Sequence, residues 1–442
     1  MLGMNQQAHA SHAIAAMRVR ASRRTRRRGA LTATVAILSV LSSVLSAGFN
    51  EELLGCYNAE EPKPASFESF LAQQAPSMAI HQLWRSAAPP SLQLTILTAA
   101  TLSRLDALAA QCDSWAGPLS AAVYVTLPPP ALFDSADARA HSGGCQLTMA
   151  LLVEVVTDDT VSQLLPINAL RNAALAASST PLVALIDVDL LPSSGLAKEL
   201  GDPESFREMR DGCASKQAWI LPAFETPKQM ALAEGVELVK SAVAGPKAAL
   251  GPLIAAGKLQ PFASVAYPRG HVCTDFQRWY ALDAGGAGGA MPGAGEGPPA
   301  GEVGAAAGGG ARPYGVGLGV NCEPWFVIDR AACPPYDARF RGYGWNKVQH
   351  VALVNASGFS FVVHPSAFIV HRPHPKSEAQ GLYTDAAKGG SGESPGKLFH
   401  RKVAAMRHVA LRDMKRGTYV AVTDSESALC RRQLSWWAQE GS

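Results

Sequence analysis

Two acidic residues, Asp187 and Asp189, end a hydrophobic run that reads VALIDVD. In open α/β sheets, ligands bind beyond the carboxyl ends of the strands. Residues i and i+2 of an extended chain point the same way, so the two carboxylates repel each other unless a cation lies between them. A hard divalent ion such as Mn²⁺ or Mg²⁺ would neutralise them and still bind diphosphate oxygens. The spacing therefore predicts a metal-assisted diphosphate site; the alternative is a pair of solvated loop acids.

A second group of polar residues, His371-Arg372-Pro373-His374, follows another apolar run. Imidazole binds Mn²⁺ well enough to complete a site that carboxylates begin. His371 comes directly after the run SAFIV, so it would lie at a strand end, as the two aspartates do. We therefore expect His371 to be the third metal ligand and His374 to be its substitute. The alternative is a surface histidine.

Arg171 and Asn172 lie in the run LPINALRNAALAAS, whose apolar residues have helical spacing, just before the strand that carries the aspartates. An arginine at that place could bind a diphosphate or a sugar carboxylate through paired hydrogen bonds. We expect both residues to contact the diphosphate ligand. The alternative for Arg171 is a position on the surface of the helix.

The segment 340–347 reads FRGYGWNK and combines glycines with aromatic and basic residues. Glycines allow a close backbone approach, while Tyr343 and Trp345 offer flat faces to a sugar ring. Lys347 could pair with an anionic group, and Asn346 lies beside it. We expect these four side chains to bind the same ligand. The alternative is a purely structural turn.

The elements that must position these residues alternate between strands and helices. A strand run at 92–98, a helical pattern at 101–115 and a strand run at 120–128 form a βαβ unit, which implies a parallel sheet. The sequence therefore predicts an α/β fold with a Rossmann-like mixed sheet flanked by helices. Further strands are expected at 149–157, 180–196, 218–224, 320–330 and 359–377, and further helices at 165–178, 229–256 and 398–416.

Composition limits the class of protein. Of 442 residues, 48% are hydrophobic and 17% are charged, against about 25% charged in an average globular chain, which excludes wholesale disorder and a coiled coil. Residues 284–311 hold 12 glycines and 9 alanines, a composition that cannot build a core and predicts a flexible insertion. The expected organisation is a basic tail at 1–29, a transmembrane helix at 30–49, a stem at 50–90, one catalytic domain at 91–417 and a C-terminal tail at 418–442.

The N-terminal segment predicts a membrane anchor. Residues 1–28 carry seven arginines and no acid, and residues 30–49 carry no charge. Twenty helical residues span about 30 Å, the thickness of a hydrocarbon core, and positive flanks stay cytoplasmic. We therefore expect a type II signal anchor with the rest of the chain in the lumen. A cleaved signal peptide and an organelle transit peptide are the alternatives.

The rest of the chain indicates a compartment and excludes one class of partner. Without its basic tail the chain is slightly acidic, which argues against a nucleic-acid-binding protein. The eight cysteines form no C-x-x-C motif, so neither a zinc ribbon nor a thioredoxin-type site is indicated. Their number permits disulfides in an oxidising compartment. Asn355-Ala356-Ser357 is a glycosylation sequon, in agreement with a luminal location.

Taken together, these motifs resemble glycosyltransferase family 49, which includes the glucuronyltransferase half of LARGE and beta-1,4-glucuronyltransferase, enzymes of the dystroglycan glycan. The similar blocks fall in order over about residues 92–375, and they read LTILTAATLSRLDALAAQCDSWAGPLSAAVYV, LPINALRNAAL, LIDVDLLPSSGL, WILPAFET, GHVCTDFQRWY, EPWFVIDR, CPPYDARFRGYGWNKVQH and FIVHRPH.

The resemblance implies a GT-A fold, Mn²⁺ dependence, and transfer with inversion from a UDP-sugar donor, usually UDP-glucuronate, to a glycan or glycoprotein acceptor. It also implies a type II Golgi membrane topology. By matching position, Asp187 and Asp189 become the metal pair and His371 the third ligand. Donor-binding residues would then be Arg171, Asn172, Asp187, Tyr343, Trp345, Asn346 and Lys347.

Some features depart from the family pattern. The Gly/Ala-rich insertion interrupts the matching region, and we expect one catalytic domain where LARGE has two. Many inverting GT-A enzymes place an acid after a G-x-G turn, where this chain has Asn346. A base must still take the acceptor proton, and Glu323 and Asp337 are the candidates, each of which could equally be a structural acid. Alternative functions are a transferase that uses UDP-xylose or another UDP-hexose, a non-catalytic glycan-binding relative, and a glycosidase with two carboxylates.

Overall fold

The computed structural model describes residues 48–126, 144–271, 273–281, 312–319, 321–375, 381–383 and 394–438. All of them belong to one compact unit, Ser46–Ser442, and the other unit, Met1–Leu45, lies outside the described residues. The predicted insertion at 284–311 also lies outside them, as does the predicted anchor at 30–49 except for its last two residues. Among the described helices, none has both the length and the apolar composition needed to cross a bilayer.

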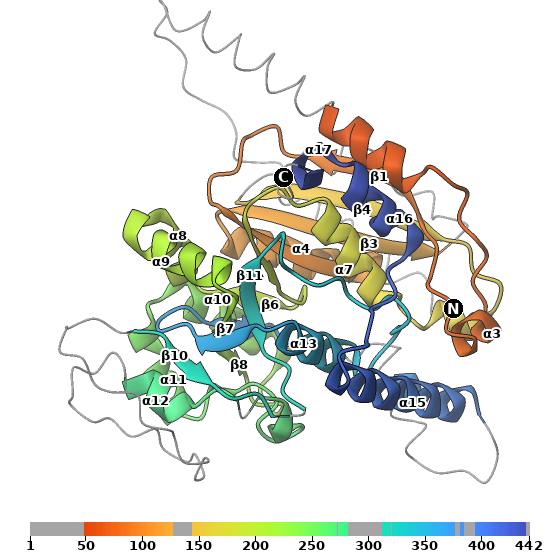
Figure 1. The fold of residues 1–442 in the computed structure, drawn as a ribbon. Coiled ribbons are helices and arrows are strands. Elements are labelled where there is room, and N and C mark those ends of the chain that lie inside the picture. The colour runs from red at the N-terminus through yellow and green to blue at the C-terminus, as the bar shows by residue number, and fades with distance from the viewer. Residues whose placement is uncertain are drawn as a thin grey trace, which may run out of the picture. The chain divides into compact units, whose positions relative to one another are not determined.

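Two sheets organise the described residues (Figure 1). A nine-stranded sheet has the order β1-β4-β3-β2-β5-β11-β7-β12-β10, and a four-stranded sheet has the order β6-β13-β8-β9. The strands are β1 Ala79–Arg85, β2 Leu94–Thr101, β3 Pro118–Thr126, β4 Gln146–Glu154, β5 Leu182–Leu185, β6 Leu190–Pro192, β7 Gln217–Leu221, β8 Ala223–Glu225, β9 Gln260–Pro261, β10 Tyr314–Val316, β11 Trp325–Asp329, β12 Ser360–Val363 and β13 Ile369–His371.

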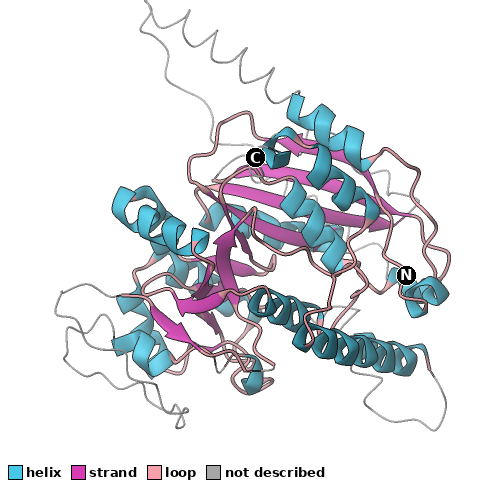
Figure 2. Ribbon diagram, in the orientation of Figure 1, coloured by secondary structure: helices cyan, strands magenta, loops and turns pink. Residues whose placement is uncertain are grey.

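Helices lie between and beside these strands (Figure 2). Residues 48–57 and 381–383 are helical. The other α-helices are α3 Phe67–Leu71, α4 Leu105–Ser114, α6 Asp159–Ser162, α7 Ile167–Ala176, α8 Ser194–Gly201, α9 Pro203–Ala214, α10 Leu232–Ala244, α11 Leu250–Ala255, α12 Phe276–Ala281, α13 Asn346–Ala356, α15 Pro395–Lys415, α16 Ser425–Gln433 and α17 Ser435–Ala438. Short 3₁₀ turns are η2 Leu102–Arg104, η3 Lys247–Ala249 and η4 Pro268–Gly270.

The centre of the large sheet is the predicted βαβ unit. Strand β2 pairs in parallel with β3 and with β5, and β3 pairs in parallel with β4. Every residue of β2 except the last is buried, because successive side chains point to opposite faces and both faces are covered. Ile96 and Ala100 belong to the core cluster that contains α4, while Leu97 and Ala99 belong to the cluster that contains α7. The predicted mixed α/β sheet flanked by helices is confirmed.

The small sheet positions His371, which is the last residue of its strand β13. β13 runs antiparallel to β6 and parallel to β8, with His371 opposite Leu190 and Glu225. Since β6 begins directly after Asp189, this register brings the end of β13 to the turn between β5 and β6. The backbone N–H of Arg372 donates to the Asp189 carbonyl oxygen at 2.7 Å and fixes the alignment.

Residues 50–90, predicted as a stem, and 418–442, predicted as a tail, are instead part of the domain where the structure describes them. β1 forms an edge of the large sheet by pairing antiparallel with β4. A disulfide joins Cys56 to Cys430, and Phe49 stacks on Trp436 with ring centroids 4.0 Å apart. The physical reason for the correction is that both segments bury hydrophobic side chains in the core cluster that contains α7.

Candidate active site

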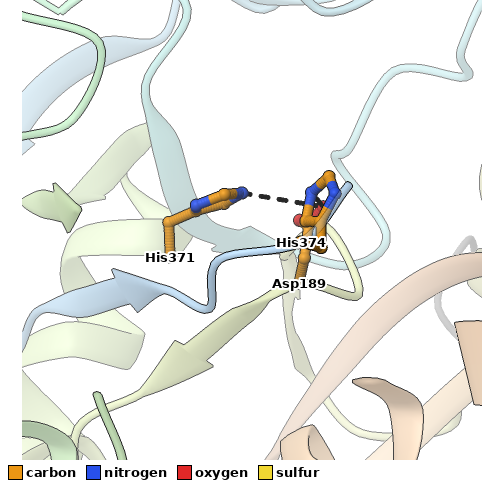
Figure 3. A group of neighbouring side chains, drawn as sticks. All are labelled: Asp189, His371 and His374. Carbon is orange, nitrogen blue, oxygen red and sulfur yellow. Dashed lines mark ion pairs between the residues drawn. The ribbon is translucent and has the colours of Figure 1, made fainter. Parts of the chain in front are cut away.

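Three side chains that could hold a metal ion converge beyond the end of β5 (Figure 3). Asp189 lies in the turn between β5 and β6, and His371 and His374 lie at and just after the end of β13. One ligand atom from each residue lies within 4.8 Å of the other two. The antiparallel pairing of β13 with β6 therefore builds the cluster from two segments that are far apart in the chain.

The geometry of this cluster suits a divalent cation. His374 Nε2 lies 2.6 Å and His371 Nε2 lies 3.8 Å from Asp189 Oδ2. Two ligand atoms bound at right angles to an ion with bonds of about 2.1 Å lie about 3.0 Å apart, and the two observed separations bracket that value. A carboxylate oxygen with two imidazole nitrogens is a donor set that Mn²⁺ accepts. These three residues fit a metal site.

Burial and the two neighbouring imidazole groups have opposite effects on Asp189. Burial alone would raise the pKa of its carboxyl group, but the interactions with His371 and His374 outweigh burial and hold the pKa well below its usual range. The carboxylate is therefore ionised at neutral pH. The structure groups His374, and not Asp187, with Asp189 and His371. The sequence predicted Asp187, Asp189 and His371 as ligands, with His374 as the substitute.

Asp187 is outside this cluster, and its carboxylate is bound by two basic side chains and by the indole N–H of a tryptophan. Its Oδ1 accepts from Arg171 Nη2 at 3.0 Å, and its Oδ2 accepts from Trp325 Nε1 at 3.1 Å and from Lys347 Nζ at 3.4 Å. Burial would raise the pKa of Asp187, but Lys347 and Arg171 hold it below its usual range. Lys347 Nζ also lies 3.5 Å from the centre of the Trp325 ring. Asp187 thus forms ion pairs with two basic side chains, Arg171 and Lys347, beside the metal cluster.

The loop before α13 places Asn346 and Lys347 at this site. Trp345, the residue before the helix, has φ +62°, and Gly344 has φ +95°, so the chain reverses sharply where the helix starts. Asn346 Oδ1 then accepts from Arg171 Nη1 at 2.9 Å. The structure therefore brings together Arg171, Asp187, Asn346 and Lys347, four of the residues that the sequence predicts to bind the donor.

A buried ion pair anchors the start of the same loop. Arg341 Nη1 and Nη2 donate to the two oxygens of Glu154 at 2.6 and 2.8 Å, and both residues are almost fully buried. Tyr124 Oη donates to the same carboxylate at 2.7 Å. Arg341 is therefore a structural residue that ties the 340–347 loop to the end of β4.

Glu323, one of the two base candidates, lies at this site. It precedes β11, and Lys347, Asp187 and Arg171 are close enough to affect its ionisation. Burial raises the pKa of Glu323, although Lys347 lowers it in part. A carboxylate with a raised pKa is a better proton acceptor at neutral pH than an ordinary one. The position and ionisation of Glu323 therefore suit a base.

Asp337, the other base candidate, lies elsewhere. Its side chain is fully buried and accepts from Arg339 Nε at 2.9 Å and from the Tyr419 hydroxyl group. Its backbone carbonyl also accepts from Asn168 Nδ2. These contacts give Asp337 a structural role at the loop that it shares with Tyr419, and they correct the prediction that it could be the base.

Asn172 is the second correction. Its Nδ2 donates to the Tyr336 carbonyl oxygen at 2.9 Å and to Asp424 Oδ1 at 3.1 Å, and its Oδ1 accepts from the Tyr336 backbone N–H at 2.8 Å. Asn172 is one residue further along the helix than Arg171, so its side chain points in another direction. These hydrogen bonds hold the backbone of Tyr336 and the side chain of Asp424, and none of them goes to the metal cluster or to Asp187.

Tyr343 and Trp345 contact aromatic and basic side chains that follow them in the chain. Tyr343 is 45% exposed and meets the Tyr383 ring edge-on with centroids 5.4 Å apart. The Arg407 guanidinium group lies 3.9 Å from the centre of the Trp345 ring. Their predicted role in sugar binding stays a prediction.

Three residues at the site carried no individual signal in the sequence. His271, Phe262 and Trp325 form an aromatic group, in which Phe262 contacts His271, Trp325 and the metal-site His371 with ring centroids 5.1 to 5.3 Å apart. His271 and Trp325 fall inside the blocks GHVCTDFQRWY and EPWFVIDR. Those blocks were the only signal that could have found them.

Comparison with known proteins relates the chain to one family. Residues 127–290 and 318–389, more than half of the chain, match the model of a family described as "Glycosyl-transferase for dystroglycan". These ranges contain both segments of the metal cluster and the residues around Asp187.

Curated relatives agree with that match. Mouse (Mus musculus) xylosyl- and glucuronyltransferase LARGE2 is 30% identical over 346 residues, which cover 74% of this chain and 43% of the relative. Human LARGE2 is 31% identical over 336 residues, which cover 74% of this chain and 39% of the relative. Human xylosyl- and glucuronyltransferase LARGE1 is 30% identical over 318 residues, which cover 70% of this chain and 35% of the relative. The chain spans less than half of the length of these relatives.

Proposed function

Since the chain belongs to the family of glycosyl-transferases for dystroglycan, we propose that it moves a sugar, glucuronate, from a UDP-sugar donor to a hydroxyl group of a glycan. The observation that carries the proposal is the juxtaposition of two groups of side chains. Asp189, His371 and His374 can hold a divalent cation, and Arg171 and Lys347 lie beside them on Asp187. Together they can bind an anionic donor.

The cation in this proposal is Mn²⁺, held by Asp189, His371 and His374. When bound, it supplies positive charge that stabilises the departing diphosphate as a Lewis acid. Arg171 and Lys347 add fixed positive charge for the diphosphate or for the carboxylate of glucuronate. Asp187 keeps both cations in place through its two carboxylate oxygens.

Glu323 completes the reaction as the base. The acceptor oxygen forms a bond to the anomeric carbon of the donor while the bond from that carbon to the β-phosphate oxygen breaks, which inverts the configuration. The proton of the acceptor hydroxyl passes to Glu323, and UDP leaves with the bonding electron pair. The raised pKa of Glu323 supports this assignment, because it makes the carboxylate a stronger proton acceptor.

We further propose that the protein works in the lumen of the Golgi, held in the membrane by residues 30–49. Disulfides at Cys56–Cys430, Cys112–Cys145 and Cys273–Cys322 support an oxidising compartment. Protease protection of tags placed at each end of the chain tests this location. A C-terminal tag that protease reaches in sealed Golgi vesicles would contradict it.

A donor screen tests the function. The purified chain is incubated with UDP-glucuronate, UDP-xylose and other UDP-hexoses, with Mn²⁺ and with a chelator, and with xylose- and glucuronate-terminated acceptors. We expect transfer from UDP-glucuronate that the chelator abolishes, and an Asp189→Asn variant that folds but transfers at least about 100-fold more slowly. If only UDP-xylose supports transfer, the donor sugar is xylose and not glucuronate. The curated relatives are named for both sugars. Full activity of Asp189→Asn, or full activity in the presence of the chelator, would contradict the metal role. Lack of transfer from every donor would contradict the proposed function.

A further inference from the structure

Two segments beside the proposed base are held close together. The backbone N–H of Glu323 donates to the Gly270 carbonyl oxygen at 2.8 Å, and a disulfide joins Cys273 to Cys322. A Cβ on residue 270 would lie 2.4 Å from a neighbouring aromatic ring and 3.4 Å from the Glu323 Cγ. The 2.4 Å contact is to Tyr267 of the same segment, so it is the hydrogen bond and the disulfide that hold His271, the next residue, close to Glu323.

The imidazole ring of His271 is fixed by two aromatic rings. It stacks on Trp325 with centroids 5.2 Å apart and an interplanar angle of 6°, and Phe262 meets it at 90° with centroids 5.1 Å apart. Burial, with a smaller effect of Lys347, lowers the pKa of His271 to about 3. The ring is therefore neutral at neutral pH, with one N–H donor and one acceptor nitrogen.

His271 and Glu323 face each other without a direct hydrogen bond. His271 Nε2 is buried and makes no hydrogen bond to any residue that the structure describes. It lies 3.9 Å from Glu323 Oε1, which is too long for a direct hydrogen bond. An oxygen atom at about 2.8 Å from each of the two atoms would bridge them by hydrogen bonds. The Glu323 side chain is 23% exposed, so a ligand can approach its carboxylate.

We propose that the acceptor hydroxyl group binds between His271 Nε2 and Glu323 Oε1, and that His271 positions it for attack. In the Nε2–H tautomer, His271 donates to one lone pair of the hydroxyl oxygen, the hydroxyl donates to Glu323, and a second lone pair attacks the anomeric carbon. The hydroxyl proton moves to Glu323 as the new bond forms. This inference rests on the proposed transferase function and adds the site that the acceptor occupies.

Two variants of His271 separate positioning from folding. His271→Phe keeps a flat ring for stacking on Trp325 and removes the nitrogen atoms, and His271→Gln offers an amide near the place of Nε2. We expect His271→Phe to lower kcat/KM for the acceptor about 30-fold, as the loss of one hydrogen bond to the reacting group would. His271→Gln should have a kcat/KM about tenfold higher than His271→Phe, because its amide can restore that hydrogen bond. UDP binding in Mn²⁺, measured by calorimetry, and hydrolysis of the donor without acceptor should stay within about twofold. His408→Phe, at an exposed histidine of α15, is the control.

A double variant identifies the partner through which His271 acts. If His271 and Glu323 hold the same hydroxyl, adding His271→Phe to Glu323→Gln should cause little further loss, whereas independent effects multiply. The inference is overturned if acceptor kinetics of His271→Phe equal those of the wild type, if the Gln variant recovers nothing, or if the two losses multiply. In each of these cases the wild-type protein still transfers sugar. The absence of transfer by the wild-type protein would instead contradict the proposed function.

Discussion

Replacing His374 by alanine tests which residues hold the cation. The ligand atoms of Asp189, His371 and His374 lie within 4.8 Å of one another. The carboxylate of Asp187, which the sequence alone predicts as a ligand, is bound by two cationic side chains. The two ligand sets therefore make opposite predictions for His374→Ala and Asp187→Asn.

The size of the effect follows from the geometry. Loss of a group that only supports a metal ligand typically costs 10- to 100-fold in metal affinity, so we expect about a 100-fold loss, about 2.7 kcal/mol of binding free energy, when a direct ligand is lost. His374 Nε2 is closer to Asp189 Oδ2 than His371 Nε2 is, at 2.6 against 3.8 Å. His374→Ala should therefore lose at least as much affinity as His371→Ala. Asp187→Asn removes a nearby charge without removing a ligand, and about three- to tenfold is expected.

The assay is a titration of each purified variant with Mn²⁺ at constant UDP, with free Mn²⁺ counted by electron paramagnetic resonance. His408→Ala changes an exposed histidine on α15 and should bind Mn²⁺ as the wild type does. A larger loss of affinity in Asp187→Asn than in His374→Ala would refute the ligand assignment. So would a His374→Ala protein that binds Mn²⁺ normally.

Three further predictions concern stability. Because burial raises the pKa of Glu323, its ionised form disfavours the fold, and wild-type stability falls as pH rises through that pKa. Scanning calorimetry should therefore find Glu323→Gln, whose transfer is expected to be slow, more stable than wild type at pH 8, with no such gain at pH 4. Arg341→Met leaves the buried charge of Glu154 without a cation and should cost about 3–5 kcal/mol of unfolding free energy in urea; a cost near zero would contradict the pairing. Serine at both Cys56 and Cys430 should cost about 2–5 kcal/mol, and unchanged unfolding without reductant would show that the disulfide does not form.

The sheet was predictable where strands are buried on both faces. β2, β3 and β4 are continuous apolar runs because helices cover both sides of a parallel sheet, so their residue types alone identify them. β1 was missed and assigned to a stem. Its residues, AIHQLWR, are mostly half-buried, and only pairing with β4 makes the segment a strand. The family predicted from the motif blocks is confirmed.

The site was predictable where a residue closely follows an apolar run of the sequence. Asp189 and His371 follow apolar runs, and they meet as expected. His374 joins them because the chain turns after β13, and the sequence offered it only as a substitute. Lys347 was expected to bind an anionic group, and the group it contacts in the structure is Asp187. His271 is an isolated histidine far from the other site residues in sequence, so no spacing could have indicated it.

The disulfide between Cys56 and Cys430 joins residues 374 positions apart. A ribosome makes the chain from the N-terminus, so Cys56 emerges long before its partner Cys430 has been synthesised. Phe49 likewise emerges long before its stacking partner Trp436. Strands β2 to β5 can pair while synthesis continues, but this end of the domain closes only after the last helices emerge. A prematurely terminated chain would therefore display an unpaired thiol and an uncovered aromatic ring, features by which thiol-exchanging chaperones can retain it.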